Sequence, residues 1–166
     1  VMMAKRIAQE TPNAILADQF YNDANPAAHY ATTGPELWEQ SEGRITHFVA
    51  GLGTSGTFMG AGRKLREVKP SVRLTSVQPD SPLHGLEGLK HMATAIVPPI
   101  YDPKLADEDL QVSTEDAFRY TRLLAKQGLF VGISSGANLA GALDVARRVE
   151  NAVVVVIFCD GGEKYL

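Results

Sequence analysis

The sequence predicts a three-layer α/β domain with a largely parallel, twisted sheet. Short β-branched runs alternate along the chain with longer helical patterns, and this alternation is typical of a parallel sheet covered by helices. The runs that predict buried strands are residues 44–50, 72–77 and 152–158. Glycine-rich and serine-rich turns follow strand-like runs, and ligands bind at such turns in this class of fold. At 166 residues the chain predicts a single domain.

The first forty residues predict two short helices and little sheet. Residues 2–10 have a helical pattern that a proline then breaks, and residues 14–16 favour a short strand. Residues 18–33 contain an Asn-Pro pair and several small side chains, which predict an ordered loop. Gly34-Pro35 then begins a second helix.

The middle of the chain predicts a strand-helix-strand unit followed by a long loop. The strand at 44–50 leads through a glycine-rich turn into a helix at 58–68, and 72–77 predicts the next strand. Residues 78–111 are rich in proline and predict a loop with a short helix at 86–93. Long loops in compact domains are often functional, so we expect this one to line a site.

The last third predicts helix, strand, helix and strand. A capping box at Ser113 opens a helix that ends near Gly128. Residues 129–133 predict a strand, 134–138 a turn and 139–149 a helix, before the strongly β-prone run at 152–158. In a parallel sheet the carboxyl ends of the strands share one edge, so we expect the polar segments that follow them to converge on one crevice. These segments are the glycine-rich turn, Gln78, residues 134–138 and residues 159–162.

Composition and charge narrow the class of ligand. The net charge is −3, with 45% hydrophobic and 21% charged residues and no basic run, which favours a small molecule over nucleic acid or an anionic membrane. No apolar run reaches the roughly 20 residues of a membrane-spanning helix, and we expect a cytoplasmic protein. The single cysteine, Cys159, excludes an intrachain disulfide and predicts an inert core residue, and the four histidines lack metal-ligand spacing.

The glycine-rich turn is the strongest local signal for a bound phosphate. Its sequence is Gly51-Leu52-Gly53-Thr54-Ser55-Gly56-Thr57. Between a strand and a helix, such a turn offers free backbone N–H groups and the positive end of the helix dipole to an anion. The spacing matches the dinucleotide fingerprint, but Gln78 stands where that motif needs an acid. No lysine follows as in a P-loop, and the hydroxyls of Thr54, Ser55 and Thr57 favour a single terminal phosphate.

Five ordered segments carry a resemblance to a known family. They are Ala24-Asn25-Pro26 with His29, Thr33 to Trp38, Gly53 to Thr57, Gly132 to Ala137, and Asp160 to Leu166. Together they resemble the fold-type II pyridoxal-phosphate enzymes, and more narrowly the cysteine synthases. Cys159-Asp160 and the segment 85–91 are similar to the cysteine synthase B branch, although the arginine pair of that branch is absent here.

The resemblance implies a fold, a cofactor and its binding residues. It implies that the chain is most of the large, cofactor-binding domain, with residues 1–13 a leading helix left from the small domain. It implies pyridoxal 5'-phosphate as cofactor, with its phosphate held by Gly53, Thr54, Ser55, Gly56 and Thr57. Ser134 is implied to offer its hydroxyl to the pyridine nitrogen; from the sequence alone, Ser134 also suits the N-cap of the following helix.

The resemblance covers only about the second half of a typical family member. The lysine that binds the cofactor, and the Thr-Ser-Gly-Asn loop that grips the substrate carboxylate, both precede this segment in the family. No lysine of this chain lies in the family's context, so we assign no catalytic residue and expect the chain alone to be inactive.

The implied reaction is β-replacement on an activated serine to form L-cysteine. Its partners are small molecules, namely O-acetylserine or a similar donor and sulfide or another sulfur source, and the resemblance implies a homodimer. Formation of cystathionine by the same chemistry stays open at this point. The two alternatives from other classes are an NAD-dependent oxidoreductase module and a non-catalytic ligand-binding or assembly protein.

Overall fold

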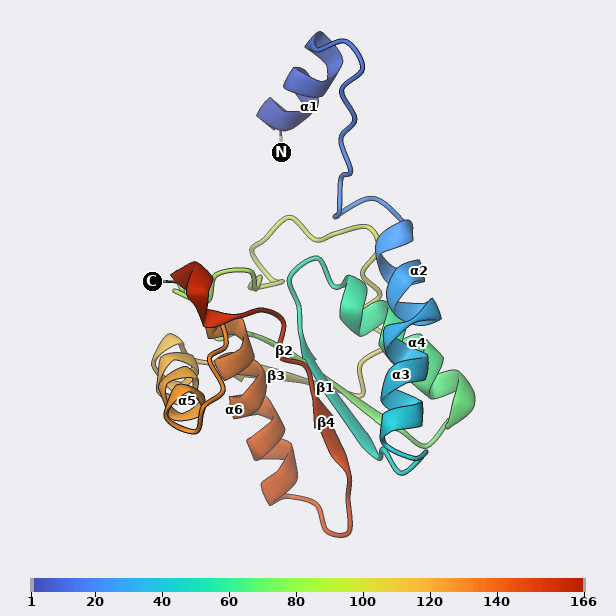
Figure 1. Ribbon diagram of the computed structural model, residues 1–166, viewed down its shortest axis with the longest axis vertical. Helices are drawn as coiled ribbons and strands as arrows, with labels where there is room; N and C mark the ends of the chain where they lie inside the picture. The colour runs from blue at the N-terminus through green and yellow to red at the C-terminus, as the bar shows by residue number, and fades with distance from the viewer. Residues whose placement is uncertain (1, 166) are drawn as a thin grey trace.

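The computed structural model describes residues 2–165, and in them a four-stranded sheet lies between two groups of helices (Figure 1). The strands are β1 (His47–Gly51), β2 (Arg73–Pro79), β3 (Glu108–Val112) and β4 (Val154–Val156). Their spatial order is β3-β2-β1-β4, and all three pairings are parallel. The predicted α/β class is confirmed.

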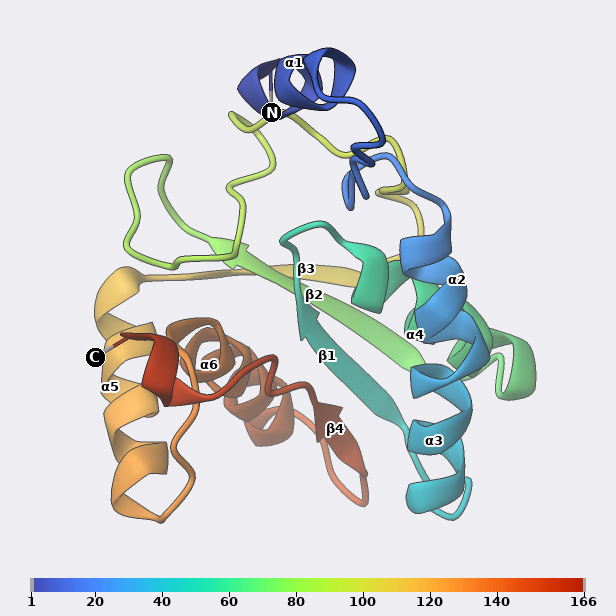
Figure 2. The same cartoon turned by 45° about the horizontal axis from the view of Figure 1, so that its top comes forward.

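The helices cover both faces of this sheet (Figure 2). On one face lie α2 (Ala24–Ala31), α3 (Thr33–Gln40) and α4 (Gly56–Val68). On the other lie α5 (Thr114–Lys126) and α6 (Ile133–Arg147). The helix predicted after Ser113 is confirmed, because the Ser113 hydroxyl accepts a hydrogen bond from the Asp116 N–H at 3.1 Å and Gly128 follows at a φ of +84°.

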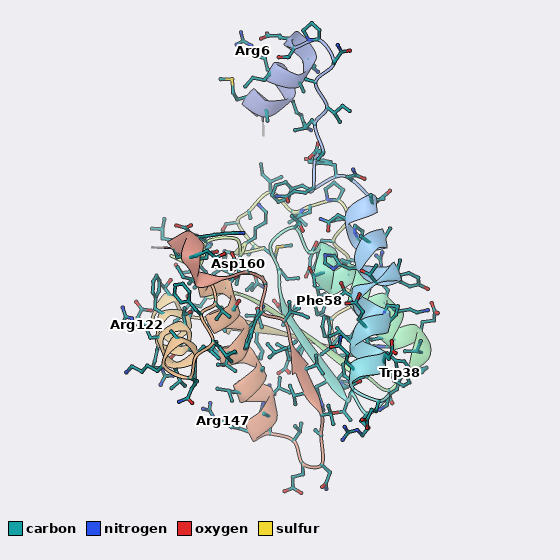
Figure 3. All side chains as sticks on the ribbon, viewed as in Figure 1. Arg6, Trp38, Phe58, Arg122, Arg147 and Asp160 are labelled. Carbon is teal, nitrogen blue, oxygen red and sulfur yellow. The ribbon has the colours of Figure 1, made fainter. Side chains whose placement is uncertain are left out.

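Two apolar clusters, one on each face, hold the layers together. Successive side chains of a strand point to opposite faces, so Phe48 of β1 packs with Phe58 and Leu65 of α4. Its neighbour Val49 packs with Ala137 of α6 on the other side. Figure 3 shows Phe58 between α4 and the sheet. The rigid sheet therefore fixes where the loops beyond its strand ends lie.

The predicted N-terminal helix forms, but it contributes nothing to this core. α1 (Met2–Glu10) buries none of its residues and stands away from the layers in Figure 1. The strand predicted at 14–16 is absent because no strand lies beside it, and Ile15 is 93% exposed. The segment 18–33, predicted as a loop, contains α2: the Asn22 side chain accepts a hydrogen bond from the Ala24 N–H at 3.0 Å, and Pro26 falls in the first turn, where its missing N–H costs nothing.

The long loop also differs from its prediction at two places. The helix expected at 86–93 is irregular backbone, because Leu86 and Leu89 are buried against the core and Lys90 N–H donates to Leu52 O at 2.8 Å. β3 forms inside the segment predicted as loop. Its residues are mostly polar, and it exists because β2 supplies a parallel partner and the Ser76 hydroxyl donates to the Asp109 carboxylate at 2.6 Å.

The strand and turn predicted between α5 and α6 are replaced mainly by helix. Residues 129–133 contain only an isolated bridge from Val131 to Gly161, and α6 begins at Ile133, so residues 134–138 are helical. Gly132 is the N-cap, which rules out the capping role considered for Ser134. The last element of the described residues is the short helix η1 (Gly162–Tyr165).

Candidate functional site

A crevice of about 300 Å³ lies beyond the carboxyl ends of β1 and β4. All six residues predicted to bind a cofactor line it: Gly53, Thr54, Ser55, Gly56, Thr57 and Ser134. The other lining residues are Gln19, Gly51, Glu87, Gly88, Leu89, Cys159, Asp160 and Tyr165. The predicted convergence is thus confirmed for three of the four polar segments.

The fourth segment, Gln78, does not reach this crevice. Its side chain is 7% exposed, donates to the Asp109 carboxylate and accepts from Met92 N–H at 2.8 Å. Both ends of the amide are therefore used inside the protein, and the end of β2 faces the long loop.

The glycine turn (residues 51–57) ends at the N-terminus of α4, which the side chain of the N-cap residue Ser55 does not cap. Ser55 has a left-handed φ of +68° at the N-cap of α4, and its hydroxyl donates to Thr54 O at 2.5 Å instead of capping the helix. The first N–H groups of a helix have no partner within it, and the helix dipole makes this end positive. The Gly56 N–H donates to Thr54 Oγ1 at 3.3 Å, and the N–H groups that follow it at the start of α4 are available to an anion in the crevice.

Two glycines of this turn are required by close approach of their neighbours. A Cβ on Gly53 would overlap the carbonyl oxygen of Gly88, and one on Gly56 would overlap the amide of Asn25. The loop around Gly88 and the helix that carries Asn25 thus pack directly against the turn. The glycine turn is held from both sides by backbone and amide groups.

Hydrogen bonds from α2 reach two hydroxyls of the glycine turn. Asn25 Nδ2 donates to Thr54 Oγ1 at 3.0 Å, and His29 Nε2 lies 3.1 Å from Thr57 Oγ1. The other ring nitrogen of His29, Nδ1, lies 2.9 Å from Thr33 Oγ1. Burial lowers the pKa of His29, so its imidazole is neutral at pH 7 and one ring nitrogen accepts while the other donates.

The opposite wall is built from the start of α6 and the segment after β4. Ser134 is 5% exposed, and Cys159 N–H donates to the neighbouring Ser135 hydroxyl at 3.0 Å. Cys159 is exposed at the crevice, so its expected place in the core was wrong. Desolvation by the crevice walls nevertheless raises the pKa of its thiol, which opposes use as a nucleophile.

The C-terminal residues close the same wall. Tyr165 donates its hydroxyl hydrogen to the Asp160 carboxylate at 2.8 Å, and desolvation together with this bond raises the pKa of Tyr165 to about 12. Gly132 N–H donates to Asp160 O at 3.0 Å, which ties this wall to the start of α6. Figure 3 shows Asp160 beyond β4, near η1.

The glycine turn is the part of the lining that suits a phosphate monoester, whereas the carboxylates of Glu87 and Asp160 belong to other segments of the lining. No lysine, arginine or histidine lines the crevice, so the groups that suit an anion there are N–H groups and hydroxyls. Sequence reasoning did not single out Gln19, and it assigned no role to Glu87, Leu89 or Tyr165, although the first two lie in the long loop that was expected to line a site and Tyr165 lies in the segment Asp160 to Leu166. Among residues 2–165 no group of three His, Cys, Asp or Glu side chains suits a metal ion, and no helix is long and apolar enough to cross a membrane.

Comparison of the sequence with known proteins finds similarity to pyridoxal-phosphate dependent enzymes. The family model for pyridoxal-phosphate dependent enzymes matches residues 1–160. A cysteine synthase from Aquifex aeolicus is 46% identical over the whole chain, which covers 53% of that protein. Cysteine synthase B from Salmonella typhimurium is 46% identical over 91% of the chain, which covers 50% of that protein. The chain thus spans about half the length of these relatives.

Solved structures agree with the sequence comparison. An O-acetylserine dependent cystathionine β-synthase from Helicobacter pylori is 39% identical with a TM-score of 0.91, and 99% of this chain covers 56% of that one. A cysteine synthase from Entamoeba histolytica is 31% identical with a TM-score of 0.90, and 99% of this chain covers 51% of that one. With this fold, the phosphate-suited crevice and the match over residues 1–160, the chain belongs to the family of pyridoxal-phosphate dependent enzymes.

Proposed function

We propose that this chain supplies the cofactor-binding half of an enzyme that forms L-cysteine by β-replacement on an activated serine. The observation that carries the proposal is the crevice itself, where Ser134 faces the glycine turn although the two lie far apart in the sequence. The cysteine synthases among the relatives support the reaction class.

Each part of the crevice has a role in holding pyridoxal 5'-phosphate. The phosphate is bound by the glycine turn, residues Gly53 to Thr57, through free N–H groups at the start of α4 and through hydroxyls. When bound, this cofactor supplies an electron sink for loss of a proton and a β-substituent from an amino acid. The pyridine nitrogen is met by the Ser134 hydroxyl on the opposite wall.

The choice of a hydroxyl at Ser134 matters chemically. A carboxylate at this place would hold a proton on the pyridine nitrogen, whereas a neutral hydroxyl leaves that nitrogen unprotonated and the sink weaker. A weaker sink is sufficient for β-elimination and replacement. The buried position of Ser134, 5% exposed, keeps water from competing for this hydrogen bond.

The remaining assignments follow from the same proposal. The substrates are small molecules, an activated serine such as O-acetylserine and sulfide or another sulfur donor, and the complete enzyme is a cytoplasmic homodimer that binds neither nucleic acid nor membrane. Residues 1–13 belong to the small domain, in agreement with the absence of buried residues in α1. Cystathionine formation, the activity named for the Helicobacter pylori structure, uses the same cofactor site.

The proposal is tested by cofactor binding to the purified protein. Pyridoxal phosphate is expected to bind more tightly than pyridoxal, which lacks the phosphate, and Ser55→Asp is expected to abolish this preference by placing a negative charge in the glycine turn. Ser81→Asp, in the exposed part of the long loop, is the matched control. Isothermal titration gives both affinities; tight binding of NADH with no preference for pyridoxal phosphate would favour the oxidoreductase alternative instead.

Activity gives a second, independent check. No lysine lines the crevice, so this 166-residue chain is expected to form no cysteine from O-acetylserine and sulfide above the level of free cofactor. Cysteine formation above that level would contradict this expectation.

A further inference from the structure

The amide of Asn25 has an orientation that its surroundings fix. Its Nδ2 lies 2.8 Å from the carbonyl oxygen of Gln19, and a carbonyl oxygen only accepts hydrogen bonds. The NH₂ group must therefore face Gln19, and the same NH₂ group also reaches Thr54 Oγ1 at 3.0 Å. The Asn25 Oδ1 on the other side packs against Gly56. The bond to Thr54 is thus a donation from Asn25 to the hydroxyl oxygen.

A second donor uses the remaining acceptor site of that hydroxyl. Gly56 N–H donates to Thr54 Oγ1 at 3.3 Å. A threonine hydroxyl has two lone pairs and one hydrogen, so with both lone pairs used only the hydrogen is left. No hydrogen bond within the described residues uses this hydrogen, and Thr54 lines the crevice. The hydroxyl of Thr54 is left with its hydrogen free to donate into the crevice.

The other hydroxyls of the glycine turn are not fixed in this way. Ser55 has already donated its hydrogen to Thr54 O, and the direction of the bond between Thr57 and His29 depends on which imidazole nitrogen carries the proton. Thr54 is therefore the hydroxyl of this turn whose polarity the surrounding protein sets in advance.

We infer that Asn25 is a positioning residue that presets Thr54 as a hydrogen-bond donor to an anionic phosphate oxygen. A bond from a hydroxyl to a charged oxygen is stronger than one between neutral groups, and a donor already turned toward its acceptor loses less entropy when the ligand binds. The inference rests on the proposed function, because it takes the phosphate of pyridoxal phosphate as the anion.

The test is a double-mutant cycle between Asn25 and Thr54, with affinities for pyridoxal phosphate and for pyridoxal measured by isothermal titration. Asn25→Ala is expected to weaken the binding of pyridoxal phosphate about tenfold, the usual effect of one charge-assisted hydrogen bond. The affinity for pyridoxal is expected to change by less than about twofold. Thr54→Val is expected to have a similar effect. The double variant is expected to bind about as tightly as Thr54→Val alone, because the two changes remove the same bond.

A near-isosteric variant, Asn25→Asp, keeps the packing against Gly56 and reverses the polarity. An ionised carboxylate at this position only accepts hydrogen bonds, so it draws the Thr54 hydrogen toward itself and away from the crevice. The affinity for pyridoxal phosphate is therefore expected to fall by more than about tenfold. In the Thr54→Val background only the charge repulsion of Asn25→Asp remains, and its effect is expected to be smaller. The matched control is Asn22→Ala, which removes a comparable amide from the start of the same helix without touching the crevice.

The outcomes separate the two proposals. The positioning role would be overturned by additive effects of Asn25→Ala and Thr54→Val. It would also be overturned by an equal loss of affinity for pyridoxal and for pyridoxal phosphate. An equal effect of Asn22→Ala would show that Asn25 acts only by holding α2 in place. A wild-type protein that does not distinguish pyridoxal phosphate from pyridoxal would overturn the proposed function itself, independently of Asn25.

Discussion

At the scale of single residues, the glycine turn and the side chains that bind to it are neutral. Hydroxyls of the glycine turn line the crevice, the Asn25 amide and the neutral His29 imidazole bind to two of these hydroxyls, and no lysine, arginine or histidine lines the crevice. Fixed dipoles of this kind are effective in a partly buried site, because they do not have to reorient when the charge arrives. One of these groups, the imidazole of His29, can be titrated, so its ionisation state can be measured.

His29 is expected to titrate below its ordinary pKa of 6.5, since burial disfavours the imidazolium form. The unfolded chain then binds more protons than the folded one as the pH falls through 6.5, so the free energy of unfolding decreases from about pH 7 toward pH 5. His47, whose pKa is lowered by desolvation and then by Arg73 and Arg148, acts in the same direction. NMR titration of the imidazoles, assigned with His29→Gln and His47→Gln, checks this.

The double variant His29→Gln/His47→Gln should also show a flatter dependence of the urea midpoint on pH than the wild type does. A His29 signal that titrates above 6.5 would contradict the burial described for this residue.

At the scale of elements, the crevice depends on how closely two helices approach. The hydroxyls belong to the turn before α4, and the groups that bind them belong to α2. At the contact, Gly60 of α4 lies against the backbone of Pro26 and Tyr30. A side chain at position 60 would separate the helices, whereas Gly62, on another face of α4, has more room.

We expect Gly60→Ala to lower the free energy of unfolding by about 1–3 kcal/mol, as overpacking does in well-packed interiors. A Cβ there would overlap Pro26 O and lie 2.8 Å from Tyr30 N, both of which are backbone atoms that cannot rotate away. Gly62→Ala is the matched control: its Cβ would lie 3.3 Å from the end of the flexible Leu74 side chain, and alanine favours helix by about 1 kcal/mol. Urea unfolding measures the free energy of unfolding of both variants. Equal losses of stability in Gly60→Ala and Gly62→Ala would contradict the packing argument.

Local patterns in the sequence predicted the elements whose residues determine their own structure. The strand before the glycine turn, the helix after it and the capped helix after Ser113 are examples, and the phosphate assignment of Gly53 to Thr57 stays a prediction. β3 was missed because Glu108, Asp109 and Gln111 become a strand only beside β2. The turn predicted at Ser134 was wrong because Gly132 already caps the helix. The contact of Asn25 with Thr54 depends on tertiary packing, and no local pattern encodes it.

At the scale of the whole molecule, the described residues fall into a layered body and a leading helix. α1 buries nothing, and its tie to the rest includes an exposed ion pair between Lys5 and Asp18 at 3.5 Å. Such pairs contribute about 0–1 kcal/mol. Apolar side chains are nevertheless displayed by this part of the chain, among them Met2, Ile7 and Ile15.

Deletion of residues 1–13 is therefore expected to shift the unfolding midpoint by less than about 4 °C, as an effect of up to 1 kcal/mol does in a domain of this size. It is also expected to reduce self-association, because it removes exposed apolar side chains. Calorimetry and size-exclusion chromatography measure the two effects. Loss of cooperative unfolding after the deletion would show that α1 is part of the folded body and would contradict its assignment to another domain.

The approach of Gly60 to Pro26 also has a consequence for protein engineering. Because the two backbones touch there, α2 and α4 cannot slide past each other without losing the contact. The glycine turn therefore does not form a portable anion receptor, since the groups that orient its hydroxyls arrive on a separate helix. A designer who grafts the glycine turn onto another scaffold has to transplant residues 19–60 together with the loop around Gly88 that packs against Gly53.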